Sequence, residues 1–597
     1  MSSMRPFIVT ELQAGKLPRW GLLLVCALYA VPGFVGRDPW RTLDAAGFGI
    51  ALTMMRGESA DWLMPNIAGQ PIVTEGPLPF WIGAAVGRAT QWLFGEHGAV
   101  RLAVLATLAA ALALVWYASY ALARRRGVQP SDPFGASASR VDYARAIADT
   151  GLLVLMATFG LLLRMHETTA EPAQLAWIAL FLFGCAHALE RPALGGTLAG
   201  AAIAASLLTR GAGHAAALLV VLVALPIASH AFRLIGRRML VFAVFAAVVL
   251  ALPWPLMLLQ SFDGRGHLSA WLAWNLESLS GPTLDSIVYF ARTAPWFYWP
   301  AWPVALWAAY RWRGSWNEPA VALPALAALA LALRALLAPQ GAEGWLLPAT
   351  APLALLAAVG MPTLKRALVN LIDWFAVTTF TLFGIVIWAY WIALMTGFPP
   401  RMAFRMRQMA PGFLPEGVFG EVVLGLAATA AWLLLVRWRI SRQPPMIWRA
   451  MVLSCGGVVF AWFLLMTLWL PVFNERNTYR DLSAELRTAF DAESPRGSDC
   501  VAGENVERAA RASFYYFAQL PFAAPQVRCR WLLVQQDGAA ARREPDIRPG
   551  WELRWQGRRR SNRDERFLLY LRGGDPVAQT ARAPAQPPDA PTRKCCR

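Results

Sequence analysis

The sequence predicts an all-α polytopic membrane protein with about thirteen transmembrane helices, followed by a small C-terminal α/β domain. Of the 597 residues, 57% are hydrophobic and only 15% are charged, and the mean hydropathy is +0.41. Soluble domains are typically about 45–50% apolar and about 25% charged. Long apolar runs recur along the chain, and arginines cluster in the short segments between them. These observations exclude a soluble globular fold.

Residues 1–471 are expected to form the transmembrane domain, because a membrane helix needs roughly 17–25 apolar residues. The first run follows Lys16 and Arg19 and precedes Arg37 without a small-residue cleavage site. It is therefore predicted to be an uncleaved anchor. The thirteen spans are predicted at 18–35, 98–122, 148–164, 172–190, 193–209, 212–231, 239–259, 295–311, 319–337, 345–362, 371–395, 418–437 and 447–470.

The basic clusters predict the orientation, because short cytoplasmic loops carry an excess of arginine and lysine. Six clusters fall on one side when the N-terminus is cytoplasmic: 124–126, 191, 233–238, 311–313, 365–366 and 437–442. An odd number of spans then places the C-terminal domain outside, with the loops 36–97, 164–171, 260–294 and 396–417. The formal charge of +18 is mainly this topology signal, and no nucleic-acid partner is expected.

Residues 472–572 are expected to form the extracytoplasmic domain. Leu482, Leu486 and Phe490 recur at the spacing of an amphipathic helix, and WLLVQQ and RFLLYLR have the composition of short strands. Residues 573–597 are rich in proline and alanine and are predicted to be disordered. Cys500 and Cys529 lie in this domain, where an oxidising compartment permits a disulfide.

The first loop, 36–97, is too polar and too long for an inert connection and is expected to contain amphipathic helices and part of a site. No P-loop, dinucleotide fingerprint, nucleophile elbow or zinc-ligand spacing occurs at a suitable position. The candidate site is instead the set of charges that the topology places on the outer face. These are Arg37, Asp38, Arg41, Asp44, Glu75, His166, Glu167, Glu171, Arg210, Arg334 and Glu343.

Arginines are bidentate donors for phosphate, and carboxylates deprotonate a hydroxyl or hold a divalent cation. A cluster at the outer membrane edge suits a lipid phosphate, whose isoprenoid tail stays in the bilayer. The alternative is that Arg210 and Arg334 extend to the headgroups or pair with a neighbouring helix for packing. Trp62 is a candidate for contact with a sugar ring, although interface belts explain most of the 28 tryptophans. His97 and His214 are interpreted as packing residues.

Several segments, in their order along the chain, resemble the lipid-A aminoarabinose transferases and the related protein O-mannosyltransferases. The resemblance covers about residues 18–365, and no single motif carries it. The segments are ADWLMPNIAGQPIVTEGPLPFW, HETTAEPAQLAWIALFL, LLTRGAG, PWFYWPAWPVALW and WLLPATAPLALLAA. These families are glycosyltransferase family 39-like enzymes of the GT-C fold.

The resemblance implies a bacterial inner-membrane enzyme that transfers a sugar from a polyprenyl-phosphate donor to lipid A, another envelope glycan or a protein, by inverting displacement. It places a first-loop acid near the catalytic centre, with Asp44 preferred to Asp38. Glu171 would be the second-loop acid, and Arg210 would contact the lipid phosphate. The other residues expected around the donor are Arg37, Arg41 and Arg334 for the phosphate, and Glu75, Trp62, His166 and Glu343 for the pocket.

The sequence departs from the family pattern at two places. Where the family has an Asp-Glu pair, this chain has Leu43-Asp44, followed by Ala45. Where the family has a lysine directly after a glutamate, this chain has Gly76 after Glu75. Arg37, Arg41 or Arg210 would have to compensate for that lysine. No cofactor is implied with certainty; Glu75 with His267 is a candidate pair for a divalent metal.

Two other functions are compatible with the sequence. One is a GT-C relative that has lost catalysis and acts as a binding or assembly protein, which the missing lysine favours. The other is a lipid or solute transporter. A transporter is expected to show an inverted repeat and charges at the membrane midplane, whereas the charges in this chain are biased toward one face.

Overall fold

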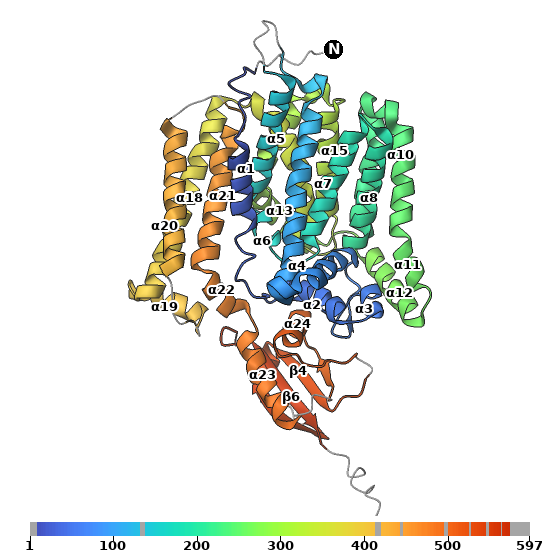
Figure 1. Cartoon of the computed structure of the whole chain (residues 1–597), viewed down its shortest axis with the longest axis vertical. Coiled ribbons are helices and arrows are strands. Elements are labelled where there is room, and N and C mark those ends of the chain that lie inside the picture. Colours follow the sequence, from blue (N-terminus) through green and yellow to red (C-terminus); the bar gives the residue numbers. More distant parts are fainter. Residues whose placement is uncertain are drawn as a thin grey trace, which may run out of the picture.

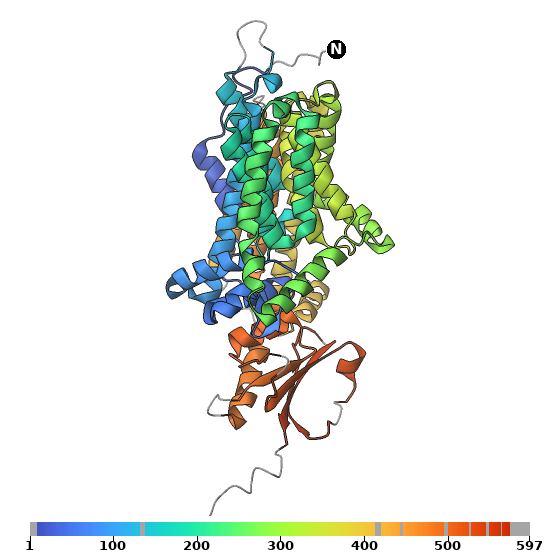
Figure 2. The ribbon, with the colours of Figure 1, turned by 90° about the vertical axis from the view of Figure 1, so that its right-hand side faces the viewer.

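The computed structural model describes residues 9–131, 138–411, 413, 419–441, 446–494, 499–524, 527–544, 548–562 and 564–573. A bundle of helices forms one end of the molecule and a small sheet domain forms the other (Figure 1). Figure 2 shows the same arrangement from the side, with the sheet domain attached to one end of the bundle. The fold class predicted from the sequence, a helical membrane protein with a small C-terminal domain, is confirmed.

Every predicted span overlaps a helix, while the count of thirteen membrane crossings stays a prediction. Within the described residues, eight helices are long and apolar enough to cross a membrane by length and composition, and two shorter apolar helices, α1 and α9, accompany them. The helices at the predicted spans are α1 (Arg19–Ala30), α4 (Leu78–Ala123), α5 (Arg140–Ala157), α7 (Glu171–Ala188), α8 (Pro192–Arg210), α9 (Ala212–Ala228), α10 (His230–Ala251), α14 (Ala301–Arg311), α15 (Pro319–Leu336), α17 (Thr350–Gly360), α18 (Arg366–Thr396), α20 (Phe419–Ser441) and α21 (Arg449–Leu468).

The first loop is folded. It contains α2 (Leu43–Arg56), α3 (Ser59–Leu63) and a hairpin of β1 (Asn66–Ile67) and β2 (Gln70–Pro71). The N-terminal part of α4 also belongs to it, because the helix breaks at Gly95, whose φ of 69° is not helical. Glycine permits this break because it has no Cβ to clash.

Further short helices connect the spans. Figure 1 shows α11 and α12 at the same end of the bundle as α2 and α3. The connecting helices are α6 (Leu161–Arg164), α11 (Pro253–Leu258), α12 (Phe262–Glu277), α13 (Leu284–Phe297), α16 (Glu343–Leu346), α19 (Pro400–Met409) and α22 (Leu470–Asn477), with the 3-10 turns η1 (Arg126–Val128), η2 (Arg313–Ser315), η3 (Leu347–Ala349) and η4 (Met361–Thr363).

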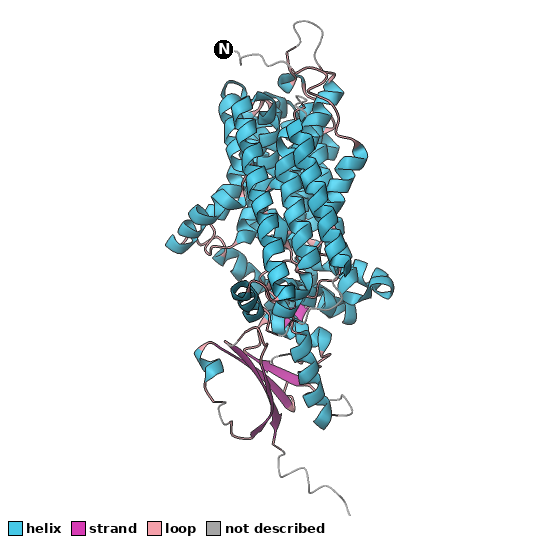
Figure 3. Cartoon of the chain, turned by 90° about the vertical axis from the view of Figure 1, so that its left-hand side faces the viewer, coloured by secondary structure: helices cyan, strands magenta, loops and turns pink. Residues whose placement is uncertain are grey.

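The C-terminal domain is a four-stranded sheet with helices. The strand order is β3-β4-β6-β5; β3 and β4 are parallel and the other pairs are antiparallel. Figure 3 shows that this domain contains most of the strands. Its elements are α23 (Arg480–Glu493), β3 (Val501–Glu504), α24 (Arg508–Phe517), β4 (Trp531–Asp537), α25 (Ala539–Arg542), β5 (Trp551–Gly557) and β6 (Glu565–Arg572).

The predicted helix and both predicted strands of this domain correspond to α23, β4 and β6. Leu482, Leu486 and Phe490 all face its core. Cys500 and Cys529 form a disulfide with their Cα atoms 5.1 Å apart. It ties the start of β3 to the start of β4 and closes a loop of 29 residues. The predicted disordered tail lies, from residue 574 on, outside the described residues.

Candidate functional site

Both carboxylate oxygens of Asp44, in the first loop, accept hydrogen bonds from the folded chain. Asp44 lies in the first turn of α2, where the helix dipole favours an anion, and it is fully buried. Its Oδ1 accepts hydrogen bonds of 2.7 Å from both the amide and the hydroxyl of Thr168. Its Oδ2 accepts from the Arg37 guanidinium at 3.0 Å and from the Trp40 amide at 3.1 Å. Asp44 therefore joins the first loop to the second.

The charge of Asp44 is fixed by its neighbours. Burial alone would raise its pKa, but the Arg37 and Arg101 guanidinium groups and the Thr168 amide hold that pKa well below its usual range. Arg101 is 2% exposed, and it donates to the carbonyl oxygens of Gly33 and His166. Asp44 is thus an ionised anchor whose oxygen atoms are all engaged.

A second group of charges lies around the start of α7. Arg164 donates from Nε to Glu343 Oε2 at 2.8 Å and from Nη1 to Glu167 Oε2 at 3.2 Å. Its Nε is also 4.0 Å from Glu171 Oε2. Glu171 is 3% exposed, and its Oε2 accepts no hydrogen bond from the described residues. Among the described carboxylates of this group, Glu171 Oε2 is thus a buried oxygen with acceptor capacity left over.

Arg210, the last residue of α8, connects this group with the first loop. Its Nη1 donates to Glu75 Oε1 at 3.2 Å, and its guanidinium lies 5.5 Å from the centre of the Trp345 ring. Arg334 lies over the same ring at 4.3 Å, and His214 stacks on it at 5.2 Å. Both Glu171 and Arg210 border Gly344, where an added Cβ would be 2.2 Å from Glu171 Oε1 and 2.8 Å from Arg210 Nη2.

We refer to these residues together as the polar cluster. Charges of both signs converge there from four separate segments, although each alone is costly to bury. The pKa of Glu75 is raised by burial and by Glu171 against the opposing effect of Arg210 and Arg508. The polar cluster consists of Glu75, Arg164, Glu167, Glu171, Arg210, His214, Arg334, Glu343 and Trp345.

Glu167 makes the stability of this region dependent on pH. Burial, followed by the Asp44 charge, raises its pKa from 4.5 to about 7. Between these values Glu167 binds more protons in the folded protein than in the unfolded chain, so its contribution to stability is fully present below about pH 4.5 and is lost as the pH rises through 7. One proton contributes a slope of at most about 1.4 kcal/mol per pH unit. We expect Glu167→Gln to flatten this slope in thermal unfolding between pH 5 and 8; an unchanged slope would contradict the assignment.

Gly76, which stands where the related families have lysine, has no room for a side chain. Its amide donates to Thr209 O at 3.0 Å, and an added Cβ would lie 2.0 Å from the carbonyl oxygen of Leu208. We expect Gly76→Ala to destabilise the protein by about 1–3 kcal/mol, as overpacking does, and Gly76→Lys to do so without increasing activity. Gly266→Ala is the matched control, because an added Cβ there meets nothing within 4 Å; equal unfolding temperatures would contradict the prediction.

Asp44 and its partner Arg37 lie outside the polar cluster, and four more residues predicted for the donor site also lie apart from it. Asp38 forms a two-pronged ion pair with Arg480 of α23. The backbone of Arg41 bonds to Asn477, and its charge acts on Glu507 of the C-terminal domain. Trp62 packs beside Arg88 and Trp81. The ring nitrogens of His166 lie 2.6 and 3.0 Å from the carbonyl oxygens of Leu162 and Tyr29, in the core of the bundle.

The candidate metal pair is not supported by a wider set of ligands. His267 lies on α12 against Trp254, and Glu75 is paired with Arg210. Within the ranges that the structure describes, no group of three or more His, Cys, Asp or Glu side chains is placed to hold a metal ion.

Arg101, Arg164, Thr168 and Trp345 were not identified from the sequence. Arg101 interrupts an apolar run, and a charge at membrane depth generally has a functional or structural partner, so that signal was available. Trp345 and Thr168 carry no such signal, since a tryptophan near a span end and a threonine in a loop are ordinary. Their contacts with Arg210, Arg334 and Asp44 are evident only in the folded structure.

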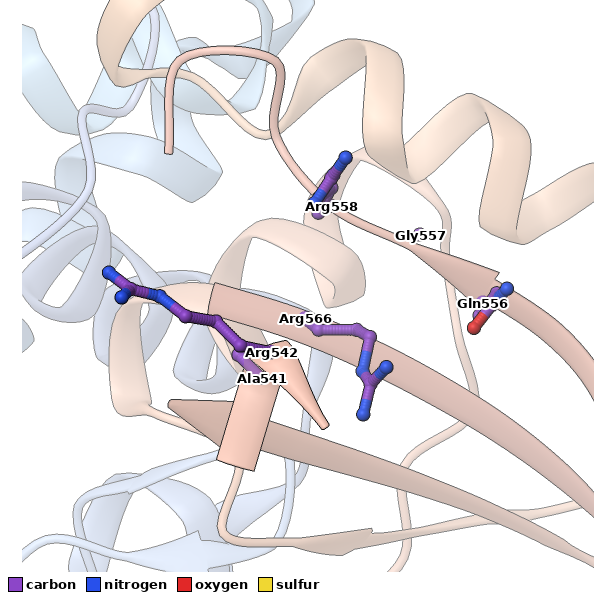
Figure 4. A pocket seen from close by; sticks show the side chains of 6 residues that line it. All are labelled: Ala541, Arg542, Gln556, Gly557, Arg558 and Arg566. Carbon is purple, nitrogen blue, oxygen red and sulfur yellow. The ribbon is translucent and has the colours of Figure 1, made fainter. Parts of the chain in front are cut away.

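A cavity of about 700 Å³ lies in the C-terminal domain and contains no member of the polar cluster. Figure 4 shows its arginines on α25 and around the β5–β6 connection. Arg542 is paired with Asp564 there, and Arg566 donates to Gln536. The cavity is lined by Ala541, Arg542, Gln556, Gly557, Arg558 and Arg566.

No protein-family model and no curated protein sequence matches this chain significantly. Solved structures do match. The crystal structure of ArnT from Cupriavidus metallidurans bound to undecaprenyl phosphate has 13% sequence identity and a TM-score of 0.61. ArnT from the same organism in the apo state has 16% identity and a TM-score of 0.61. Each match covers 92% of this chain and 97% of the other. Over 92% of its length, therefore, this chain has the GT-C fold of the aminoarabinose transferase ArnT.

Proposed function

We propose that this chain is an integral-membrane glycosyltransferase that transfers a sugar from a polyprenyl-phosphate donor to an acceptor outside the cytoplasm. The observation that carries the proposal is the polar cluster, in which Arg210 lies between Glu75 and the Trp345 ring. A similar fold has been solved with undecaprenyl phosphate bound. A bacterial inner membrane with the N-terminus in the cytoplasm agrees with the arginine-rich loops described above.

The chemistry of the cluster fits a phosphate leaving group. In an inverting step the acceptor oxygen attacks the anomeric carbon, the bond from that carbon to the phosphate oxygen breaks, and its electron pair stays on the phosphate. In this proposal Arg210 and Arg334 offset the charge that develops there. A hydroxyl acceptor also loses a proton, and Glu171 Oε2, which is buried and accepts no hydrogen bond from the described residues, is the acceptor best suited to receive it.

Asp44 is assigned a positioning role in this scheme. Its four accepted hydrogen bonds leave no oxygen for a substrate proton, but they hold Thr168 and hence the second loop, three residues before Glu171. Asp38, paired with Arg480, holds the first loop to the C-terminal domain. Lipid A, another envelope glycan and a protein remain the acceptors to be compared.

The test is a transfer assay with purified full-length protein in lipid nanodiscs, a labelled pool of undecaprenyl-phosphate sugars, and lipid A, envelope glycan and membrane proteins as separate acceptors. We expect transfer to one acceptor class, and its loss in Glu171→Gln. Binding of undecaprenyl phosphate without transfer from any donor would favour the binding or assembly role instead. Absence of both binding and transfer would overturn the proposal.

A further inference from the structure

The C-terminal domain reaches the first loop through α24. Ala512 packs directly against Gly49 of α2, where an added Cβ would be 2.4 Å from the Ala512 Cβ. Arg511 is 4% exposed and donates to the carbonyl oxygens of Ile67 at 2.9 Å and Ala68 at 2.6 Å. Figure 1 shows α24 at the top of the sheet domain, next to α2. The β1–β2 hairpin is therefore held by a helix more than 400 residues away in sequence.

Arg508 lies one helical turn before Arg511 and extends to the segment that follows the hairpin. Its Nη1 donates to the hydroxyl of Thr74 at 3.0 Å, and its charge acts on the adjacent Glu75. The side chain is exposed, and among the described residues no ion pair includes it. A guanidinium has five N–H donors, so this bond orients the group and leaves the others available to a ligand.

Glu75 thus has two arginines near it, Arg210 from α8 and Arg508 from α24. The Glu75 carboxylate neutralises the charge of Arg210, and the positive charge of Arg508 is not neutralised by this pair. The first loop itself cannot supply a cation at the next residue, because Gly76 lies against the Leu208 carbonyl. Arg334 and Arg164 supply positive charge from the bundle side of the polar cluster. On the side of the first loop, the cation beside Glu75 comes from the C-terminal domain, as Arg508.

We propose that Arg508 is a further binding residue for the phosphate of the polyprenyl donor, contributed by the C-terminal domain. The inference rests on the proposed function, since it takes the donor phosphate to lie at Arg210. It assigns the C-terminal domain a direct part in substrate binding, in addition to its packing against the first loop. Arg508 acts on donor affinity and leaves the proton transfer to other groups.

The test measures undecaprenyl phosphate binding to the full-length protein in nanodiscs by intrinsic tryptophan fluorescence. Loss of a charge-assisted hydrogen bond to phosphate is expected to raise the Kd of Arg508→Ala about tenfold or more, with partial recovery in Arg508→Lys. In the transfer assay KM should rise more than kcat falls. Arg530→Ala is the matched control: Arg530 is also an exposed arginine of this domain, but it pairs with Asp499. Competition by inorganic phosphate would indicate a site that binds the phosphate group alone. Lack of competition would indicate a site that also requires the lipid.

The outcomes distinguish this inference from the proposed function. If Arg210→Ala weakens binding while Arg508→Ala binds as wild type, Arg508 is not a ligand residue and the proposed function stands. If wild type itself does not bind the lipid phosphate, both fail. A purely structural role predicts that Arg508→Ala and Thr74→Val lower the unfolding temperature equally without changing Kd, and that result would also overturn the inference.

Discussion

Replacement of Asp44 by asparagine is expected to lower the unfolding temperature of the protein and to reduce sugar transfer at least about 100-fold. The substitution removes the counter-charge of Arg37 and places an amide N–H₂ opposite two of the four donors that Asp44 accepts from. Breaking one partner of a buried ion pair costs about 3–5 kcal/mol. Transfer should fall because the second loop, held through Thr168, no longer positions Glu171.

The controls separate a positioning role from a direct chemical one. Asp38→Asn, in a pair whose Arg480 side chain is 59% exposed, should cost much less stability. Adding Arg37→Met to Asp44→Asn should restore part of the stability, because the unpaired buried charge is then gone. If Asp44 itself takes the substrate proton, Asp44→Asn will abolish transfer while the unfolding temperature hardly changes, and our assignment will be wrong.

The stability contribution of Asp44 should also persist into acid. A carboxylate whose folded-state pKa is lowered stabilises the protein above its unfolded pKa, about 3.9, and loses that contribution only as the pH falls through the folded value. This is the opposite sign to Glu167, whose raised pKa makes the charged form unfavourable. The two residues therefore act in different pH ranges.

Replacement of Arg210 by alanine is expected to reduce kcat/KM for donor transfer about 100- to 1,000-fold, the effect seen when one preorganised charge stabiliser is removed. It also leaves the partly buried Glu75 without its ion-pair partner. Arg210→Lys should recover only part of the activity, since lysine cannot provide the bidentate geometry of a guanidinium. The measurement is steady-state transfer with varied donor concentration.

The matched control for Arg210 is Arg439 in α20. Its ion pair with Asp373 is equally shielded, with side chains 14% and 15% exposed against 16% and 19% for Arg210 and Glu75. The pair links two bundle helices away from the polar cluster. Arg439→Ala should lose comparable stability and retain transfer; equal losses of transfer in both variants would mean that the effect of Arg210 is structural.

The sequence predicts the two central strands of the C-terminal sheet but not the two edge strands, because only the central strands are well buried. WLLVQQ and RFLLYLR were identified because their apolar runs fill the centre of the sheet as β4 and β6. β5 was missed because this edge strand, WELRWQG, is mostly exposed and carries charges. β3 was missed because it is only four residues long. Edge and short strands give little hydrophobic periodicity to detect.

The sequence by itself determined the membrane class and the positions of the apolar helices, because each span must satisfy its own backbone hydrogen bonds in lipid and so is encoded locally. It also indicated Glu75, Glu171, Arg210 and Glu343 as site candidates. Only the tertiary structure decided which charges meet. The partners of Asp44, Asp38 and Glu75 come from the second loop, α23 and α8, 124, 442 and 135 residues away. Hydrogen bonds and ion pairs form only between groups in contact, so partners this far apart in the chain are set by the fold.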